Sequence, residues 1–108
     1  MKIAGEKAKV FEDHRRLLEM KDINAVIIAT PEHLHTPQLI DAVTAGKDVY
    51  VEKPLTLFVR EGRWMINVAK RYKRVIQVGV QNRSAPNFQR AREFVQQGGL
   101  GKVVAAQD

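Results

Sequence analysis

Three short apolar runs recur about every 25 residues along the chain, and this rhythm constrains the fold more than any other feature. The first run, Ala25–Ala29, has no polar alternation, which is typical of a parallel strand covered on both faces. The other two runs are Val49–Lys53 and Val75–Gly79. Because a stretch of helical periodicity separates each pair of runs, the sequence predicts βαβ units with right-handed crossovers in one parallel sheet.

Two long helices are predicted between these strands. The first runs from about residue 32 or 33 to residue 45 and stops at Gly46, with a buried face made of His35, Leu39, Ala42 and Val43. The second runs from about residue 58 to residue 72, with a buried stripe made of Phe58, Gly62, Met65, Ala69 and Tyr72.

The helix and strand patterns are less regular near the two ends of the chain. Lys9–Phe11 is interpreted as a short strand, followed by a short helix with Asp13 as its N-cap and Leu17 and Leu18 on its buried side. The alternative is a single helix from Lys7 to Met20. Near the other end, Ser84 and Pro86 predict a helix start, Gly98–Gly99 its end, and Phe88, Ala91 and Val95 its buried face. Lys102–Ala106 is expected to begin another strand.

A chain of 108 residues suits one domain of ordinary size. A parallel sheet, however, needs helices on both faces and protected edges, and the predicted elements make only half of such a fold. We therefore expect the chain to be part of a larger protein, truncated at both ends.

Composition excludes some classes of protein. The chain is 44% hydrophobic and 28% charged, as soluble globular proteins are, and it lacks both a membrane-spanning apolar run and a signal-peptide core at its N-terminus. It has no cysteine, which excludes disulfides and thiol chemistry. Its net charge of +6 and pI of about 9.9 suit an anionic partner such as nucleic acid, a membrane surface or a phosphorylated cofactor, or else a solvated basic surface.

The stretch Asp48–Pro54 combines a strand with ionisable groups. Pro54 has no N–H for a ladder, so the strand is expected to end there. Because side chains alternate along a strand, Lys53 shares a face with Val51 and Glu52 takes the other face. Both groups would lie at the carboxyl end of a strand, which is the edge where open α/β sheets bind ligands. Thr30–Pro31 and Gly79–Arg83 end the other two strands at the same edge.

Lys53 has two interpretations. It is either a surface lysine at a strand end or a general acid/base, because oxidation of an alcohol removes a proton together with a hydride. A lysine can accept that proton if burial or a nearby positive charge, such as an oxidised nicotinamide ring, lowers its pKa. His33 and His35 are two residues apart and would point to different helix faces, so no metal site is expected. His35 is interpreted as a packed or cofactor-facing residue.

With these residues the chain resembles the inositol dehydrogenase and glucose–fructose oxidoreductase family (Gfo/Idh/MocA) of NAD(P)-dependent enzymes. The similarity begins at about Val10, and its most specific part is Gly46–Leu55. The other matching segments are Ile28–Pro31 with His35, Val78–Arg83, and Gly98–Val103. The resemblance implies a partial Rossmann nucleotide-binding domain over residues 1–100, with residues 101–108 as the first strand of a following α/β substrate domain.

The resemblance also implies roles for individual residues. Lys53 would catalyse proton transfer beside the nicotinamide and Glu52 would contact the ribose of NAD or NADP. Thr30, Pro31 and His35 would line the cofactor cleft, and Gln81 and Arg83 would lie near its nicotinamide end. The implied substrate is a sugar, an inositol or a related polyol or glycoside. A cytoplasmic location and a homo-oligomer when complete are expected, without nucleic acid or membrane partners.

Two parts of the family pattern are absent. No Gly-x-Gly-x-x-Gly turn follows a strand, and the Asp-x-x-x-His helix of the family would lie after Asp108. The 108 residues alone are therefore expected to bind NAD weakly or not at all and to be inactive. Two alternatives from other classes are a nucleic-acid-binding module that uses the basic helix around Arg60–Arg74, and a non-catalytic remnant that self-associates through open sheet edges.

Overall fold

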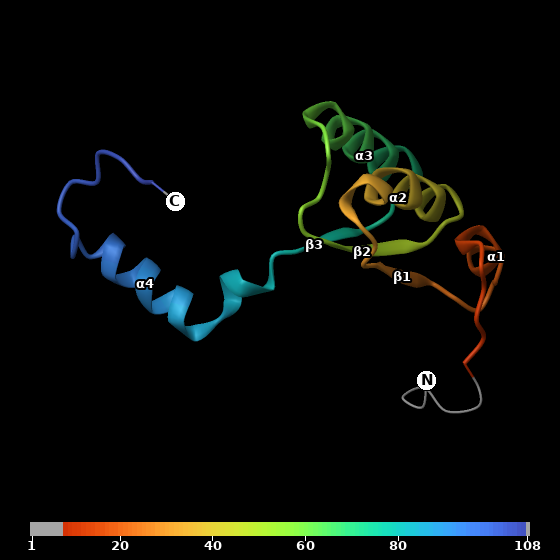
Figure 1. Ribbon diagram of the computed structural model, residues 1–108, viewed down its shortest axis with the longest axis horizontal. Helices are drawn as coiled ribbons and strands as arrows, with labels where there is room; N and C mark the ends of the chain where they lie inside the picture. The colour runs from red at the N-terminus through yellow and green to blue at the C-terminus, as the bar shows by residue number, and fades with distance from the viewer. Residues whose placement is uncertain (1–7, 108) are drawn as a thin grey trace.

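The computed structural model describes residues 8–107, and its centre is a three-stranded parallel sheet in the order β1-β2-β3. The strands are β1 (Ala25–Ile28), β2 (Asp48–Glu52) and β3 (Ile76–Gly79) (Figure 1). Ile28 pairs with Val51, and Val51 pairs with Val78. The predicted parallel α/β sheet is thus confirmed, with strand ends within one residue of those expected from the apolar runs.

One face of the sheet is covered by α2 (His35–Thr44) and α3 (Val59–Tyr72), and a 3₁₀ turn, η1 (Glu32–Leu34), leads into α2 (Figure 1). The predicted buried face of α2 is confirmed, since all four of its residues are buried: His35, Leu39, Ala42 and Val43. Gly46 follows the end of α2 and has φ +79°, in the left-handed region that glycine tolerates best.

The stripe predicted for α3 is correct in the middle and wrong at both ends. Met65 is buried, whereas Phe58 is 64% exposed and Tyr72 is 39% exposed. Phe58 precedes the helix with an extended backbone, so helical periodicity does not determine its direction. Glu61 stabilises this start by accepting the N–H groups of Leu57 and Phe58 at 2.8 Å and 3.1 Å.

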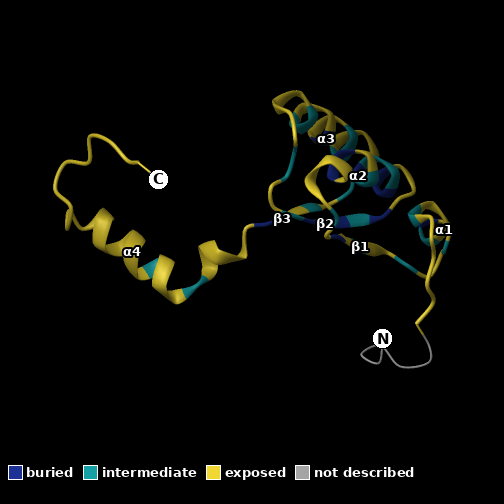
Figure 2. Cartoon of the chain, viewed as in Figure 1, coloured by how far each residue is buried: buried dark blue, intermediate teal, exposed yellow. Residues whose placement is uncertain are grey.

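The hydrophobic core lies between the sheet and these two helices. Val49 and Val51 point into it from β2, and Leu39 and Val43 meet them from α2. The opposite face of the sheet has no covering layer among residues 8–107 (Figure 2). Ile27, which alternates with the core-facing Val26 and Ile28, is 76% exposed. The prediction that β1 is covered on both faces is therefore wrong for the described chain, because both crossover helices lie on one side.

At the N-terminal side, α1 (His14–Leu18) is a short helix that packs beside α2. Asp13 is its N-cap as predicted, and its carboxylate accepts the Arg15 N–H at 2.9 Å, which holds the pKa of Asp13 below its ordinary value. Leu18 is buried. Residues 9–11 are exposed and form no strand, so that prediction is wrong, and so is the longer helix alternative. Among residues 8–107, no neighbouring strand lies there to pair with them.

After β3, η2 (Gln81–Ser84) leads into α4 (Pro86–Gln96), which extends away from the sheet (Figure 1). Pro86 begins the helix as predicted, and Gly98 follows its end with φ +83°. The predicted buried face is wrong: α4 has no buried residue, and Phe88 is 52% exposed. Residues 102–106 form no strand, because no strand edge of the described part of the chain lies beside them (Figure 1). Within residues 8–107, every helix is too short or too polar to cross a bilayer.

Candidate functional site

The polar residues predicted to form a site all lie at the carboxyl edge of the sheet. Thr30 and Pro31 follow β1, Lys53 and Pro54 follow β2, and the residues of η2 follow β3. In a parallel sheet these three strand ends meet at one edge, which is where ligands bind in open α/β folds. The side chains form two groups, one around His35 and one around Glu52.

His35 is buried, with 1% of its surface exposed, and it connects two of the three loops. Its Nδ1 lies 2.8 Å from the backbone oxygen of Pro54, and its Nε2 lies 2.8 Å from the backbone oxygen of Thr30. A neutral imidazole donates to only one of these carbonyls, whereas the doubly protonated ring donates to both. Both nitrogens face backbone acceptors, so the ring has no free polar atom for a ligand.

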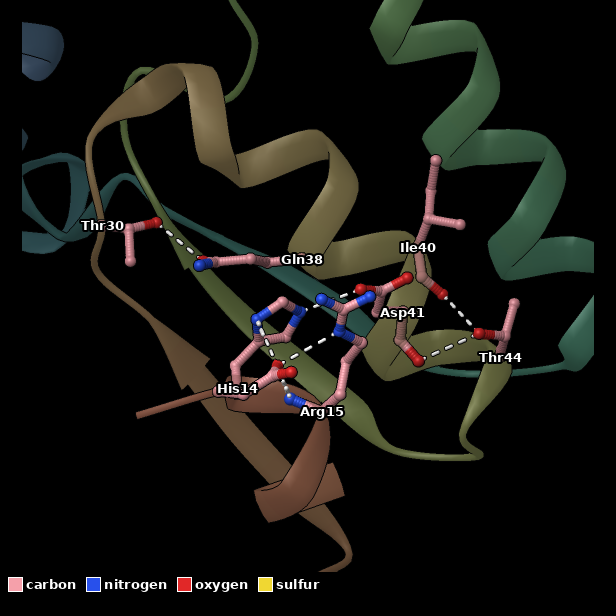
Figure 3. A network of polar contacts seen from close by, with 8 residues as sticks. His14, Arg15, Thr30, Gln38, Ile40, Asp41 and Thr44 are labelled. Carbon is pink, nitrogen blue, oxygen red and sulfur yellow. Dashed lines mark hydrogen bonds and ion pairs between the residues drawn. The ribbon is translucent and has the colours of Figure 1, made fainter. Parts of the chain in front are cut away.

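Thr30 is held by a residue that sequence reasoning did not select. Its hydroxyl donates to Oε1 of Gln38 at 2.8 Å, from the second turn of α2 (Figure 3). Pro31, next in the chain, is exposed at the edge. The same view shows His14 of α1 reaching Asp41 of α2 at 2.8 Å, a contact that attaches α1 to α2 rather than forming part of the edge (Figure 3).

Glu52 lies at the centre of the second group, on the uncovered face of the sheet. Its carboxylate accepts the Lys53 N–H at 3.2 Å and the Gln81 side-chain amide at 3.4 Å. Tyr50 donates its hydroxyl to the same amide's oxygen at 3.2 Å. Tyr50 and Glu52 are two residues apart on one strand and so share a face, which is the signal by which Tyr50 could have been recognised.

Gly79 makes room for this carboxylate. It is the register partner of Glu52 on β3, and a β-carbon at Gly79 would lie 2.8 Å from Oε2 of Glu52. Any larger residue at this position would push the carboxylate away. The sequence does not reveal this role, because it depends on the register between two strands.

Lys53 and Arg83 line one hollow at the edge, next to the Glu52 group. Its lining consists of Lys53, Gly79, Val80, Gln81, Asn82 and Arg83. The side chains of Lys53 and Arg83 are both exposed, and neither makes a side-chain hydrogen bond with another residue of the described range. Two positive charges and two amides therefore border a space that is open to solvent. Such a border suits a polar or anionic small molecule.

The structure thus brings Glu52, Lys53, Gln81 and Arg83 together in one place. Thr30 and Pro31 lie on the neighbouring loop, and His35 lies beneath both loops. No three His, Asp or Glu side chains within residues 8–107 are grouped so that they could hold a metal ion.

Comparison with known proteins relates the chain to a family. Residues 4–80 match the model of an oxidoreductase family with an NAD-binding Rossmann fold. The rhizopine catabolism protein MocA of Rhizobium meliloti is 30% identical over 103 residues, which cover 95% of this chain and 32% of that protein. The scyllo-inositol 2-dehydrogenase (NAD(+)) of Bacillus subtilis is 37% identical over 93 residues, covering 86% of this chain and 27% of the enzyme.

A solved structure gives the same relationship. The scyllo-inositol dehydrogenase from Lactobacillus casei, with bound NAD(H) and scyllo-inositol, superposes with a TM-score of 0.73 at 31% identity. The match covers 85% of this chain and 27% of that one. The chain therefore spans about a third or less of the length of each of these proteins.

Proposed function

This chain belongs to the oxidoreductase family with an NAD-binding Rossmann fold, and from that premise we propose that the carboxyl edge of its sheet binds the nicotinamide half of NAD or NADP. The observation that carries the proposal is the convergence of Glu52, Lys53 and Gln81 beside one open hollow. These groups come from two different strand ends, and only the parallel topology brings them together.

The donors and acceptors at this edge fit half of the cofactor. The Glu52 carboxylate is partly exposed and can accept hydrogen bonds from ribose hydroxyls, while Gln81 offers an amide beside it. The pyrophosphate of the cofactor needs a different kind of site. Glycine-rich turns at helix N-termini bind it in Rossmann folds, and the sequence contains no Gly-x-Gly-x-x-Gly. We therefore assign the nicotinamide–ribose end of the cofactor to this edge.

The proposed reaction is transfer of a hydride between the cofactor and a polyol, sugar or related glycoside. When bound, the nicotinamide ring would supply the hydride acceptor or donor. Lys53 supplies the remaining chemistry, because an alcohol that loses a hydride must also lose its hydroxyl proton. Lys53 lines the hollow, and its amine makes no hydrogen bond to another described residue, so it is free to meet a substrate hydroxyl. Arg83 and Gln81 can orient the other hydroxyls.

The test is NAD(P)-dependent oxidation of inositols and sugars by the full-length protein. Lys53→Ala should lower kcat by about 100-fold or more, which is the usual contribution of a general base, and should leave NADH affinity within a few-fold. Lys70→Ala is the matched control, since Lys70 is an exposed lysine on α3, away from this edge. Near-normal turnover by Lys53→Ala would contradict the proposed role. Absence of NADH binding by the unaltered protein would contradict the cofactor assignment.

A further inference from the structure

The imidazole of His35 is the only described side chain that lies within hydrogen-bond distance of the backbone of both the loop after β1 and the loop after β2. Each of its nitrogens lies 2.8 Å from a carbonyl oxygen, one of Thr30 and one of Pro54. Thr30 is followed in the chain by Pro31, and Pro54 is preceded by Lys53. The ring thus lies between the two backbone segments that carry the proposed cofactor loop and the proposed base.

The helix that carries His35 is held firmly. His35 is the first residue of α2, and Leu39 and Val43 on the same face have 0% of their surface exposed in the core. The side chain therefore starts from a fixed point on the helix, and its burial keeps water away from the ring. Both contacts are part-buried, and a carbonyl that loses its hydrogen-bond donor in such a place costs stability, so the ring constrains the loops that it contacts.

We infer that His35 is a positioning residue that sets the spacing between the Thr30–Pro31 loop and the Lys53–Pro54 loop. It acts through the backbone and touches neither cofactor nor substrate, because both of its nitrogens are used within the protein. The spacing of the loops follows from the contacts alone. Its consequence for catalysis rests on the proposed function, since it matters only if Lys53 must face the nicotinamide.

The chain supplies a matched control at the opposite end of the sheet. Lys47 is also buried, with 6% exposed, and its amine donates to the backbone oxygens of Met20 and Ile23 at 2.7 Å and 2.8 Å. Like His35, Lys47 has a buried polar side chain that contacts two backbone carbonyls. Unlike His35, it holds the segment before β1 and contacts neither loop of the candidate site.

The experiment compares amide hydrogen exchange in the full-length protein and in its His35→Leu and Lys47→Met variants. Two amides report on the loops: Leu34 N–H donates to Pro31 O at 2.9 Å, and Leu57 N–H donates to Glu61 at 2.8 Å. His35→Leu should accelerate exchange at both amides by about tenfold or more, while Val51 in the core stays protected. Lys47→Met should leave both amides unchanged. Unchanged exchange at both amides in His35→Leu, or an equal acceleration at Val51, would overturn the inference.

Kinetics provide the second readout. At a temperature where all variants are folded, His35→Leu should lower kcat by about tenfold or more, and Lys47→Met should stay within about twofold. His35→Gln retains an N–H donor and should recover part of the loss. A loss of thermal stability with unchanged kcat in His35→Leu would show a structural role only. If the unaltered protein neither binds NADH nor turns over, the proposed function fails, and the exchange measurement still decides the role of His35.

Discussion

The carboxylate of Glu52 lies where the side chain of residue 79 would be if that residue were not glycine. A β-carbon at Gly79 would be 2.8 Å from Oε2 and 3.0 Å from Cδ of Glu52. Gly79 is buried, and the two residues are register partners on adjacent strands. The position of the carboxylate at the proposed cofactor edge therefore depends on the absence of one methyl group on the neighbouring strand.

Gly79→Ala should displace the carboxylate with little effect on folding. The atom that the new methyl meets is the end of a flexible side chain, so the free energy of unfolding should change by less than about 1 kcal/mol. NADH affinity of the full-length protein should fall by about tenfold, the effect of losing one hydrogen bond to a charged group. Denaturant unfolding and fluorescence titration measure the two quantities.

Gly62→Ala is the control for this substitution. Gly62 lies within α3, and a β-carbon there would meet nothing within 4 Å. The change should stabilise the protein by about 0.5–1 kcal/mol through helix propensity and leave NADH affinity unaltered. Equal NADH affinities for both variants would show that Glu52 does not need the space at Gly79.

Much of the fold can be predicted from the sequence, because each prediction depends on a local period. The apolar runs around Val26, Val51 and Val78 indicate strands, and the 3.6-residue period of α2 identifies all four of its buried residues. The same period marks an apolar face on α4 but does not say what covers it. Phe88 is exposed because no described element packs against that face.

In the candidate site, too, some features can be predicted from the sequence and others depend on the three-dimensional structure. Parallel topology alone predicts that Thr30, Lys53 and Gln81 meet at one edge, because the carboxyl ends of parallel strands lie together. The resemblance to the family, with a Rossmann-type fold, is confirmed by the match over residues 4–80. The contact between Gly79 and Glu52 could not be predicted, since it requires the register between β2 and β3. The bond from His35 to Pro54 likewise requires the three-dimensional path of a loop.

Two neighbouring isoleucines in β1 should respond very differently to truncation. Ile28 faces the core and is 6% exposed, whereas Ile27 faces the uncovered side and is 76% exposed. Ile28→Ala should cost about 2–5 kcal/mol of unfolding free energy, from lost burial and a cavity. Ile27→Ala should cost less than about 1 kcal/mol. Urea unfolding of the 108-residue chain measures both. Similar losses for the two variants would mean that a layer covers Ile27 in solution.

The contact between His14 and Asp41 should contribute a small, salt-dependent coupling between α1 and α2. The two side chains meet at 2.8 Å but are 39% and 40% exposed, so solvent screens the pair. A double-mutant cycle with His14→Ala and Asp41→Ala should give a coupling free energy of about 0.2–1 kcal/mol that decreases at high salt. A coupling that is zero at low salt would show that burial of Leu18, not this pair, holds α1 in place.

Glu61 should make folding sensitive to acid. Its carboxylate accepts the backbone N–H groups of Phe58 and Leu57, and these hydrogen bonds hold the pKa of Glu61 below its ordinary value of about 4.5. A lowered pKa in the folded state means that the stabilisation is fully present above the ordinary value and is lost as the pH falls through the folded-state pKa. Urea unfolding from neutral pH to acidic pH should therefore show a decline that begins near pH 4.5. Glu61→Gln should flatten part of that decline, because the amide keeps an acceptor oxygen but does not titrate.

Glu93→Gln is the control. Glu93 lies on α4 and makes no side-chain hydrogen bond in the described range, so this variant should leave the decline unchanged. If both variants follow the original pH profile, the hydrogen bonds at the start of α3 do not contribute to acid sensitivity.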